Sequence, residues 1–376
     1  MHEWDDPFAL GPVRKVYLIW LSGASCEGCT VAVTGGTHPR IEQLLTGAIP
    51  GLPKVELIHS LLSTESGASW IENLVMAERG ELDAPYIITW EGSVVDESVA
   101  GDGFWSALGE DPVTGRPITT SEWLDRLAGG AAAVIAIGTC ASWGGIPAAA
   151  GNVTNATGLG AHLGPGYRSA AGVPVVNIPG CAPLGDNFTE TAAALLLHLN
   201  GLAPLPELDE SGRPSWLFSE TVHSTCPRAG YYDDGVFAAE GGTETCLVEL
   251  GCWGPVVQCN IAERGVIDGH GGCMAMGGIC IGCTMPGFPD RYSPFSVIHE
   301  LVSEVFPAAP EPVAGGFLRR MRMVRGRHRR SHQAAGPTNA VGRGDATAHA
   351  SPARFYRAGV AVPPEGAEAH QADHTP

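Results

Sequence analysis

Short apolar runs alternate with amphipathic stretches through the first two hundred residues of the chain. The runs have the length of strands and are apolar throughout, which is typical of parallel strands buried on both faces. Residues 66–81 and 186–200 have helical periodicity, and Thr119 to Glu122 resembles the capping box at the start of a helix. The predicted strands are residues 15–21, 54–60, 85–90, 132–138 and 173–178.

This alternation predicts an α/β fold with a doubly wound parallel sheet over residues 1–201. After residue 201 the periodic pattern gives way to proline, glycine and cysteine, so residues 202–306 are predicted to form an irregular second domain. Residues 307–376 are basic and rich in glycine and alanine, and we expect a disordered tail. No stretch approaches the roughly 18 consecutive apolar residues that a membrane-spanning helix needs.

Cysteine is concentrated late in the chain, since residues 223–283 contain seven of the eleven cysteines. Thiols at this density indicate disulfides, zinc or iron–sulfur clusters. The odd count disfavours disulfides, and the N-terminus lacks the features of a secretory signal, which favours a reducing compartment. Zinc sites usually contain two close cysteine pairs, whereas here Cys280 and Cys283 form the one such pair in the segment. The pattern therefore favours iron–sulfur clusters over zinc, and zinc over disulfides.

The other four cysteines directly follow predicted strands. Cys26 and Cys29 follow the first strand, Cys140 follows the fourth and Cys181 follows the fifth. In doubly wound sheets ligands bind beyond the carboxyl ends of the strands, so we expect these thiols to converge at one edge. Ordinary buried thiols are the alternative. Three separate strand ends that carry cysteine beside glycine favour a shared site.

The charge of the chain is divided between an acidic body and a basic tail. Ten of the 22 Lys and Arg residues lie in residues 319–376, together with only four of the 40 acidic residues. Residues 1–318 therefore hold 12 basic and 36 acidic side chains, which disfavours nucleic acid as a partner. The arginine run 319–330 could attach the protein peripherally to anionic lipid or to an acidic partner, although a solvated tail is the commoner explanation.

Taken in order, the motifs resemble those of the small, electron-transferring subunit of NiFe hydrogenases, over about residues 15–290. The resemblance is to the soluble or actinobacterial type of uptake hydrogenase. It implies a hydrogen:acceptor oxidoreductase whose nickel–iron centre lies in an obligate large subunit, so no catalytic residue is expected in this chain. The motifs are Cys26-Glu27-Gly28-Cys29, Trp90-Glu91-Gly92, Gly138-Thr139-Cys140, Pro179-Gly180-Cys181, His223-Ser224-Thr225-Cys226, Gly251-Cys252-Trp253 and Cys280-Ile281-Gly282-Cys283.

The resemblance further implies three iron–sulfur clusters, and we predict that each is a 4Fe–4S cluster. Many relatives hold a three-iron medial cluster with three cysteines, whereas this chain has Cys273 near the fourth corner of that cluster. The alternative is a three-iron cluster, with Cys273 as a spare thiol. Glu27 is either an oxygen ligand in place of a thiolate or an acid beside the proximal cluster. The predicted ligands are Cys26, Cys29, Cys140 and Cys181 (proximal), His223, Cys226, Cys246 and Cys252 (distal), and Cys259, Cys273, Cys280 and Cys283 (medial).

From these features we expect hydrogen uptake in the cytoplasm, because no twin-arginine signal precedes the first domain. Electrons would pass to a redox partner or a quinone pathway, and the heterodimers are expected to form a higher oligomer. A hydrogen-sensing hydrogenase and a zinc-stabilised binding module are the two alternative functions. A related subunit of the respiratory complex I type would share only the first domain.

Overall fold

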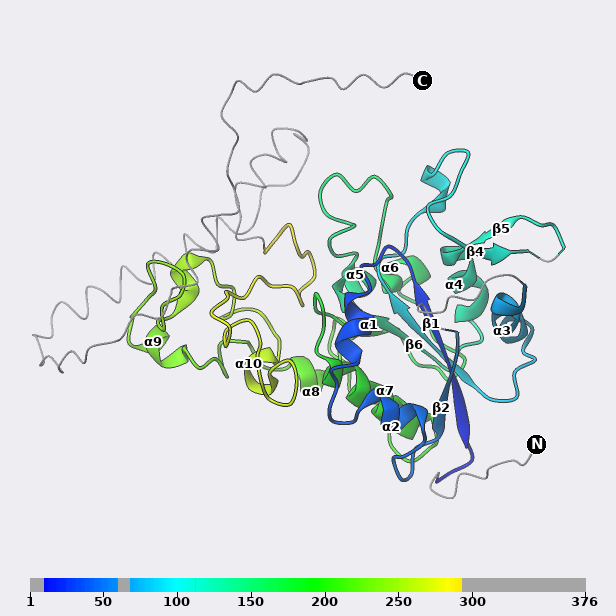
Figure 1. Cartoon of the computed structure of the whole chain (residues 1–376), viewed down its shortest axis with the longest axis horizontal. Helices are drawn as coiled ribbons and strands as arrows, with labels where there is room; N and C mark the ends of the chain where they lie inside the picture. The colour runs from blue at the N-terminus through cyan, green and yellow to red at the C-terminus, as the bar shows by residue number, and fades with distance from the viewer. Residues whose placement is uncertain (1–9, 60–67, 112, 293–376) are drawn as a thin grey trace, which may run out of the picture.

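The computed structural model describes residues 10–59, 68–111 and 113–292, so the predicted tail, residues 307–376, lies outside the described residues. The first part of the chain is built on a parallel sheet with the strand order β2-β1-β3-β6-β7 (Figure 1). This is the flavodoxin-like order, and it confirms the predicted fold class. The strands are β1 (Lys15–Ser22), β2 (Lys54–His59), β3 (Tyr86–Glu91), β6 (Ala133–Ile137) and β7 (Val176–Ile178).

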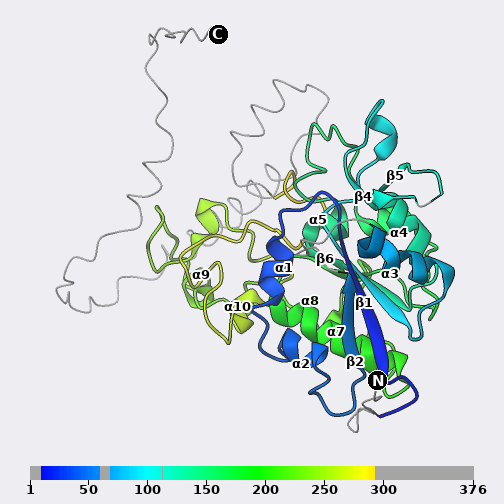
Figure 2. The same ribbon diagram turned by 45° about the vertical axis from the view of Figure 1, so that its right-hand side comes forward.

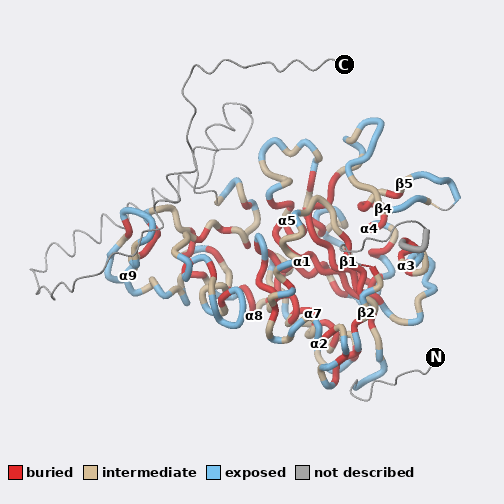
Figure 3. The backbone as a smooth tube through the Cα atoms, in the orientation of Figure 1, coloured by how far each residue is buried: buried red, intermediate tan, exposed pale blue. Residues whose placement is uncertain are grey.

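Helices cover both faces of this sheet (Figure 2). They are α2 (Ile41–Leu45), α3 (Ala68–Arg79), α4 (Thr120–Ala128) and α7 (Gly185–Leu199). On one face, Trp90 of β3 belongs to the same core as Leu74 of α3 and Trp123 of α4. On the other face, Ile87 of β3 belongs to a second core with Phe188 of α7. Successive strand residues point to opposite faces, so burial of both faces explains the continuous apolar runs. Strands β3, β6 and β7 are buried along their whole length, and the centre of the sheet is red in Figure 3.

The carboxyl ends of four strands lie level with one another. Ser22 of β1 pairs with Glu91 of β3, Glu91 pairs with Ile137 of β6, and Ile137 pairs with Ile178 of β7. The segments that follow these strands therefore all start from one edge of the sheet. The remaining helices of the first part are short, namely α1 (Gly28–Val33), the 3-10 turn η1 (Glu97–Val99), α5 (Gly138–Trp143) and α6 (Leu159–Leu163).

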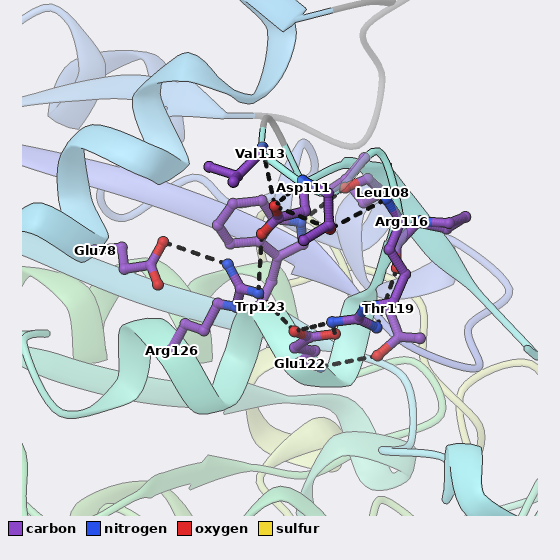
Figure 4. A network of polar contacts seen from close by, with 11 residues as sticks. Glu78, Leu108, Asp111, Val113, Arg116, Thr119, Glu122, Trp123 and Arg126 are labelled. Atoms are coloured by element: carbon purple, nitrogen blue, oxygen red, sulfur yellow. Dashed lines mark hydrogen bonds and ion pairs between the residues drawn. The ribbon is translucent and has the colours of Figure 1, made fainter.

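An antiparallel hairpin of β4 (Ala107–Glu110) and β5 (Pro117–Thr119) precedes α4. Figure 4 shows the charged side chains that attach it to the helix: Glu122 accepts from Arg116 at 2.7 Å, and Arg126 lies 3.7 Å from the carboxylate of Asp111. The hydrophobic pattern does not predict this hairpin, because its two strands are too short to show an apolar alternation.

The part of the chain after residue 201 has little regular structure among the described residues, as predicted, and forms the lobe that contains α9 and α10 in Figure 1. Its buried apolar cluster is small and includes Val222, Trp253 and Met274. The boundary at residue 201 stays a prediction. No helix in the described part of the chain is long and apolar enough to cross a membrane. The short helices of this lobe are α8 (Ser215–Phe218), α9 (Ala229–Asp233), the 3-10 turn η2 (Leu247–Leu250) and α10 (Ile261–Arg264).

Candidate metal-cluster sites

The first set of predicted ligands lies at the level edge of the sheet. Cys26 and Cys29 follow β1, and Cys29 stands in the first turn of α1. Cys140 lies in α5 directly after β6, and Cys181 follows β7. The charges of Cys26, Cys140 and Cys181 all act on the Cys29 thiol, so the structure brings together four cysteines from three strand ends.

Two glycines leave room for these sulfurs. Gly138 has φ +85°, and a Cβ at this position would lie 2.4 Å from Sγ of Cys29. Gly145 has φ +52°, and its Cβ would lie 2.8 Å from Sγ of Cys140. Backbone conformation and space both demand glycine here. The glycine of the Gly138-Thr139-Cys140 motif, which follows β6, is therefore required by its close approach to the thiol of Cys29, which follows β1.

Glu91 holds the loop that carries Cys29. Its side chain is buried, and its carboxylate accepts hydrogen bonds from the backbone nitrogens of Cys29 and Thr30 at 3.0 Å each. The hydroxyl of Thr30 donates to the same carboxylate. A buried charge is tolerated when its hydrogen bonds are made, so these contacts fix α1 against the end of β3. The signal in the sequence is a charged residue at the end of a buried strand, in Trp90-Glu91-Gly92, but the sequence does not reveal its partners.

Glu27 lies between the two cysteines of the first motif in an unusual conformation. Its φ of +63° is rare for a residue other than glycine. Burial and the charge of Glu91 raise the pKa of the Glu27 carboxyl, and a hydrogen bond from the Ser22 hydroxyl lowers that pKa in part. Among the described residues, no group donates to Oε2 of Glu27, although this atom is buried. The structure thus places an acid with a shifted pKa beside the first set of thiols.

The second set lines a cavity in the irregular lobe, and Arg228 lies at the same cavity. The backbone nitrogen of Arg228 donates to Sγ of Cys226 at 3.4 Å, and its guanidinium donates to the Thr245 carbonyl at 2.9 Å. Burial raises the pKa of the Cys246 and Cys252 thiols, and the Arg228 charge offsets part of this rise. The predicted ligands around this cavity are His223, Cys226, Cys246 and Cys252.

The third set lines a further cavity, whose wall is completed by Gly180 and Pro183 from the first part of the chain. Burial raises the pKa of Cys259 to about 11 and that of Cys283 to about 12. Metals bind the thiolate, so a bound cation must release these protons. The predicted ligands around this cavity are Cys259, Cys273, Cys280 and Cys283.

The three sets are arranged in a row. The backbone nitrogen of Cys280, in the third set, donates to Sγ of Cys252, in the second set, at 3.2 Å. The cavity of the third set is walled on its other side by Gly180, which directly precedes Cys181 of the first set. The third set therefore lies next to both of the other sets.

The donor groups fit iron–sulfur clusters better than a single ion. All eleven cysteines are free thiols. Within residues 10–59, 68–111 and 113–292, no three His, Cys, Asp or Glu side chains are arranged to hold one metal ion. The second and third sets instead surround cavities. Their donors are thiols and one imidazole, which are known ligands of iron–sulfur clusters. A flavodoxin-like sheet with such sets in a row fits the class of iron–sulfur electron-transfer proteins.

Two protein families match the chain. The C-terminal family of the NiFe/NiFeSe hydrogenase small subunit matches residues 218–296, and the 20 kDa subunit of NADH ubiquinone oxidoreductase matches residues 26–195. The small subunit of the periplasmic NiFeSe hydrogenase of Desulfomicrobium baculatum is 33% identical over 76% of this chain and 88% of its own length. The hydrogenase-2 small chain of Escherichia coli is 32% identical over 72% of this chain and 67% of its own.

A solved structure gives a similar result. The actinobacterial-type NiFe hydrogenase of Ralstonia eutropha is 43% identical with a TM-score of 0.74, over 92% of this chain and 99% of that chain. The present chain therefore belongs to the family of NiFe hydrogenase small subunits, the electron-transfer subunits that pair with a large subunit. This confirms the resemblance and the function inferred from the motifs. The individual ligands stay predictions.

Proposed function

We propose that this chain conducts electrons from hydrogen oxidation, at the nickel–iron centre of its large subunit, through three iron–sulfur clusters to a redox acceptor. The observation that carries the proposal is the row of three donor sets, in which the third set is hydrogen-bonded to the second and shares its cavity with the segment that leads to Cys181 of the first. A bound cluster supplies a one-electron redox centre. The chain supplies the ligands, the spacing between the sites and the burial that sets their potentials.

We assign four ligands to each cluster, as predicted from the sequence. Cys273 lines the same cavity as Cys259, Cys280 and Cys283, which supports four irons at the medial site. We assign Glu27 as an acid beside the proximal cluster, with a carboxylate ligand as the alternative, because four cysteines already converge at this edge. The proximal assignment of Cys26, Cys29, Cys140 and Cys181 rests on their convergence at the sheet edge.

His223 marks the exit of electrons in this proposal. Its ring packs edge-on against Tyr232, with the ring centroids 4.5 Å apart. A neutral imidazole leaves the cluster one negative charge fewer than a thiolate would, and Arg228 adds a positive charge at the same cavity. Both effects favour arrival of an electron at this end of the row.

The proposal extends to the partners and to the location of the protein. Cys26 and Cys181 are exposed in the isolated chain, and Val31 of α1 is 67% exposed, which supports a large subunit that covers the proximal edge. A downstream redox partner or quinone pathway and a higher oligomer of heterodimers remain part of the proposal. A cytoplasmic location also remains part of the proposal. Cell fractionation tests this location, because mature protein in the periplasm would contradict it.

The experiment that tests the function is iron and acid-labile sulfide analysis, with low-temperature EPR, on the heterodimer purified without oxygen. Three four-iron clusters require about twelve irons per chain. We expect this count, with nickel in the large subunit and hydrogen-dependent reduction of the clusters. Zinc in place of iron would overturn the electron-transfer role and would support a binding module.

A further inference from the structure

Thr139 lies where the first and third donor sets meet. It is the second residue of α5, directly before Cys140, and its side chain is 1% exposed. The sequence shows it only as the middle residue of Gly138-Thr139-Cys140. A buried hydroxyl needs partners, and the partners of this one come from two distant segments of the chain.

The hydroxyl of Thr139 uses both of its hydrogen-bonding capacities. Its oxygen accepts from the backbone nitrogen of Gly180 at 2.9 Å, and its proton is donated to the backbone carbonyl of Cys283. The backbone nitrogen of Thr139 also donates to the Gly180 carbonyl at 3.0 Å. Gly180 precedes the proximal ligand Cys181, and Cys283 is a medial ligand. Thr139 therefore links the segments of three predicted ligands, namely Cys140, Cys181 and Cys283.

Neighbouring contacts continue this junction into the medial site. Nε1 of Trp143, also in α5, donates to the Thr284 carbonyl at 3.4 Å. The hydroxyl of Thr284 donates to the carbonyl of Gln258, next to the ligand Cys259, at 2.8 Å. These bonds attach both medial ligand segments to the helix that carries Cys140. The hydroxyl of Thr139 is the buried centre of this network.

We propose that Thr139 is a positioning residue that fixes the proximal ligand loops against Cys283 and provides a hydrogen-bonded route for electrons between the two sites. This inference rests on the proposed function. With the clusters bound, one electron would leave the reduced proximal cluster and enter the oxidised medial cluster in each event. Thr139 itself gains no electron and keeps its proton, because its hydrogen bonds serve only to hold and couple the two ligand frameworks.

The test compares two substitutions with a matched control. Thr139→Val keeps the branched shape and removes the hydroxyl, whereas Thr139→Ser keeps the hydroxyl. The control is Thr191→Val on α7, since Thr191 is equally buried and its hydroxyl donates to the Asn187 carbonyl at 2.6 Å. Each variant is purified as the heterodimer. The measurements are iron content, the EPR splitting between the reduced proximal and medial clusters, and the rate of dye reduction by hydrogen.

With full iron content, we expect Thr139→Val to alter the splitting and to slow dye reduction by at least about tenfold, within the 10- to 100-fold loss usual for outer hydrogen bonds of metal sites. Thr139→Ser and Thr191→Val should match the wild type. An unchanged splitting and rate in Thr139→Val, or the same change in Thr139→Ser, would overturn the inference while leaving the proposed function intact.

Loading of the clusters decides the remaining outcomes. If Thr139→Val fails to take up iron and Thr139→Ser takes it up, the hydroxyl is required for positioning and the inference is supported. If both variants fail to take up iron, the effect comes from side-chain shape and the inference about the hydroxyl is overturned. A wild-type heterodimer without iron would overturn the proposed function, and this inference with it.

Discussion

Cys273 is the single residue on which the composition of the medial cluster depends. It stands on a turn between Gly272, with φ +108°, and Met274, which is buried. A Cβ at Gly272 would approach Cγ1 of Ile261 to 3.0 Å, so the turn passes close to α10. This path brings Cys273 to the cavity that the other three thiols line.

Replacing Cys273 by serine should convert the medial site to a three-iron cluster, because a hydroxyl is a far poorer iron ligand than a thiolate. We expect the iron content to fall from about twelve to about eleven per chain, the count for one missing corner, with a three-iron EPR signal in the oxidised protein. Met276→Ser, on the same turn and 80% exposed, is the control. Twelve irons per chain in Cys273→Ser would show that Cys273 is not a ligand of the medial cluster.

At this scale the sequence predicts candidate ligands, but it does not predict the residues that support them. Cysteine and histidine at these spacings have few other uses, so the motifs indicate clusters directly. Glu91 and Thr139 act on segments about 40 to 140 residues away, through hydrogen bonds that only the fold creates. A single glutamate or threonine in a motif does not show which residues it will contact in the folded chain.

At the scale of elements, a turn around Arg213 attaches the start of the second lobe to its ligand segments. Nε of Arg213 donates to Oδ2 of Asp209 at 2.7 Å, and the Arg213 guanidinium also donates to Gln258, next to Cys259. The Arg213 side chain is 5% exposed and lies over the ring of Phe218 at 5.2 Å. This one cation therefore connects the turn, α8 and the medial ligand segment.

Arg213→Met should destabilise this lobe, because it leaves the Asp209 carboxylate without its partner. Breaking a buried pair costs about 3–5 kcal/mol, and we expect the lower end because Asp209 is 24% exposed. The measurement is the temperature at which the heterodimer loses its cluster absorption. Arg264→Met is the control, since Arg264 pairs with Glu190 on a more exposed surface. Equal effects of the two substitutions would contradict the role of Arg213.

The longer elements follow the hydrophobic pattern, and the short ones do not. The predicted helix start at Thr119 is confirmed, because its hydroxyl accepts from the backbone nitrogen of Glu122 at 3.2 Å. The last strand is shorter than predicted, as β7 begins only at Val176, two residues after Pro174, which has no N–H to pair. Helices α1 and α5 have six residues each, which is too few for an apolar period to appear.

For the whole molecule, removal of iron should unfold the second lobe and spare the sheet. Within residues 10–59, 68–111 and 113–292, the apolar cluster of the lobe contains five buried residues, against 20 and 18 in the two cores that flank the sheet. Cluster binding must therefore supply much of the folding free energy of the lobe. Amide hydrogen exchange with and without an iron chelator tests this. Protection should be lost over residues 215–292 and kept in β1 and β3; uniform loss, or none, would contradict it.

Docking of the large subunit should depend on the exposed face of α1. Val31 is 67% exposed and lies two residues beyond Cys29. If the partner covers it, Val31→Glu buries an unpaired carboxylate at a cost of about 3–5 kcal/mol, and the yield of heterodimer should fall steeply. The control is Val113→Glu, in the β4–β5 connection and 89% exposed. Co-purification of the large subunit is the measurement, and equal yields would place the interface elsewhere.

The shared wall of the medial cavity has a consequence for motion. Domains within one chain are generally free to move against each other unless their contact is extensive. Here Gly180 and Pro183 close a cavity whose thiols come from the other lobe, and Thr139 is bonded across the same joint. A hinge opening at this joint would break the bond between Thr139 and Cys283 and open the wall of the medial cavity to solvent. We therefore expect electron transfer between the two lobes to require this joint to stay closed.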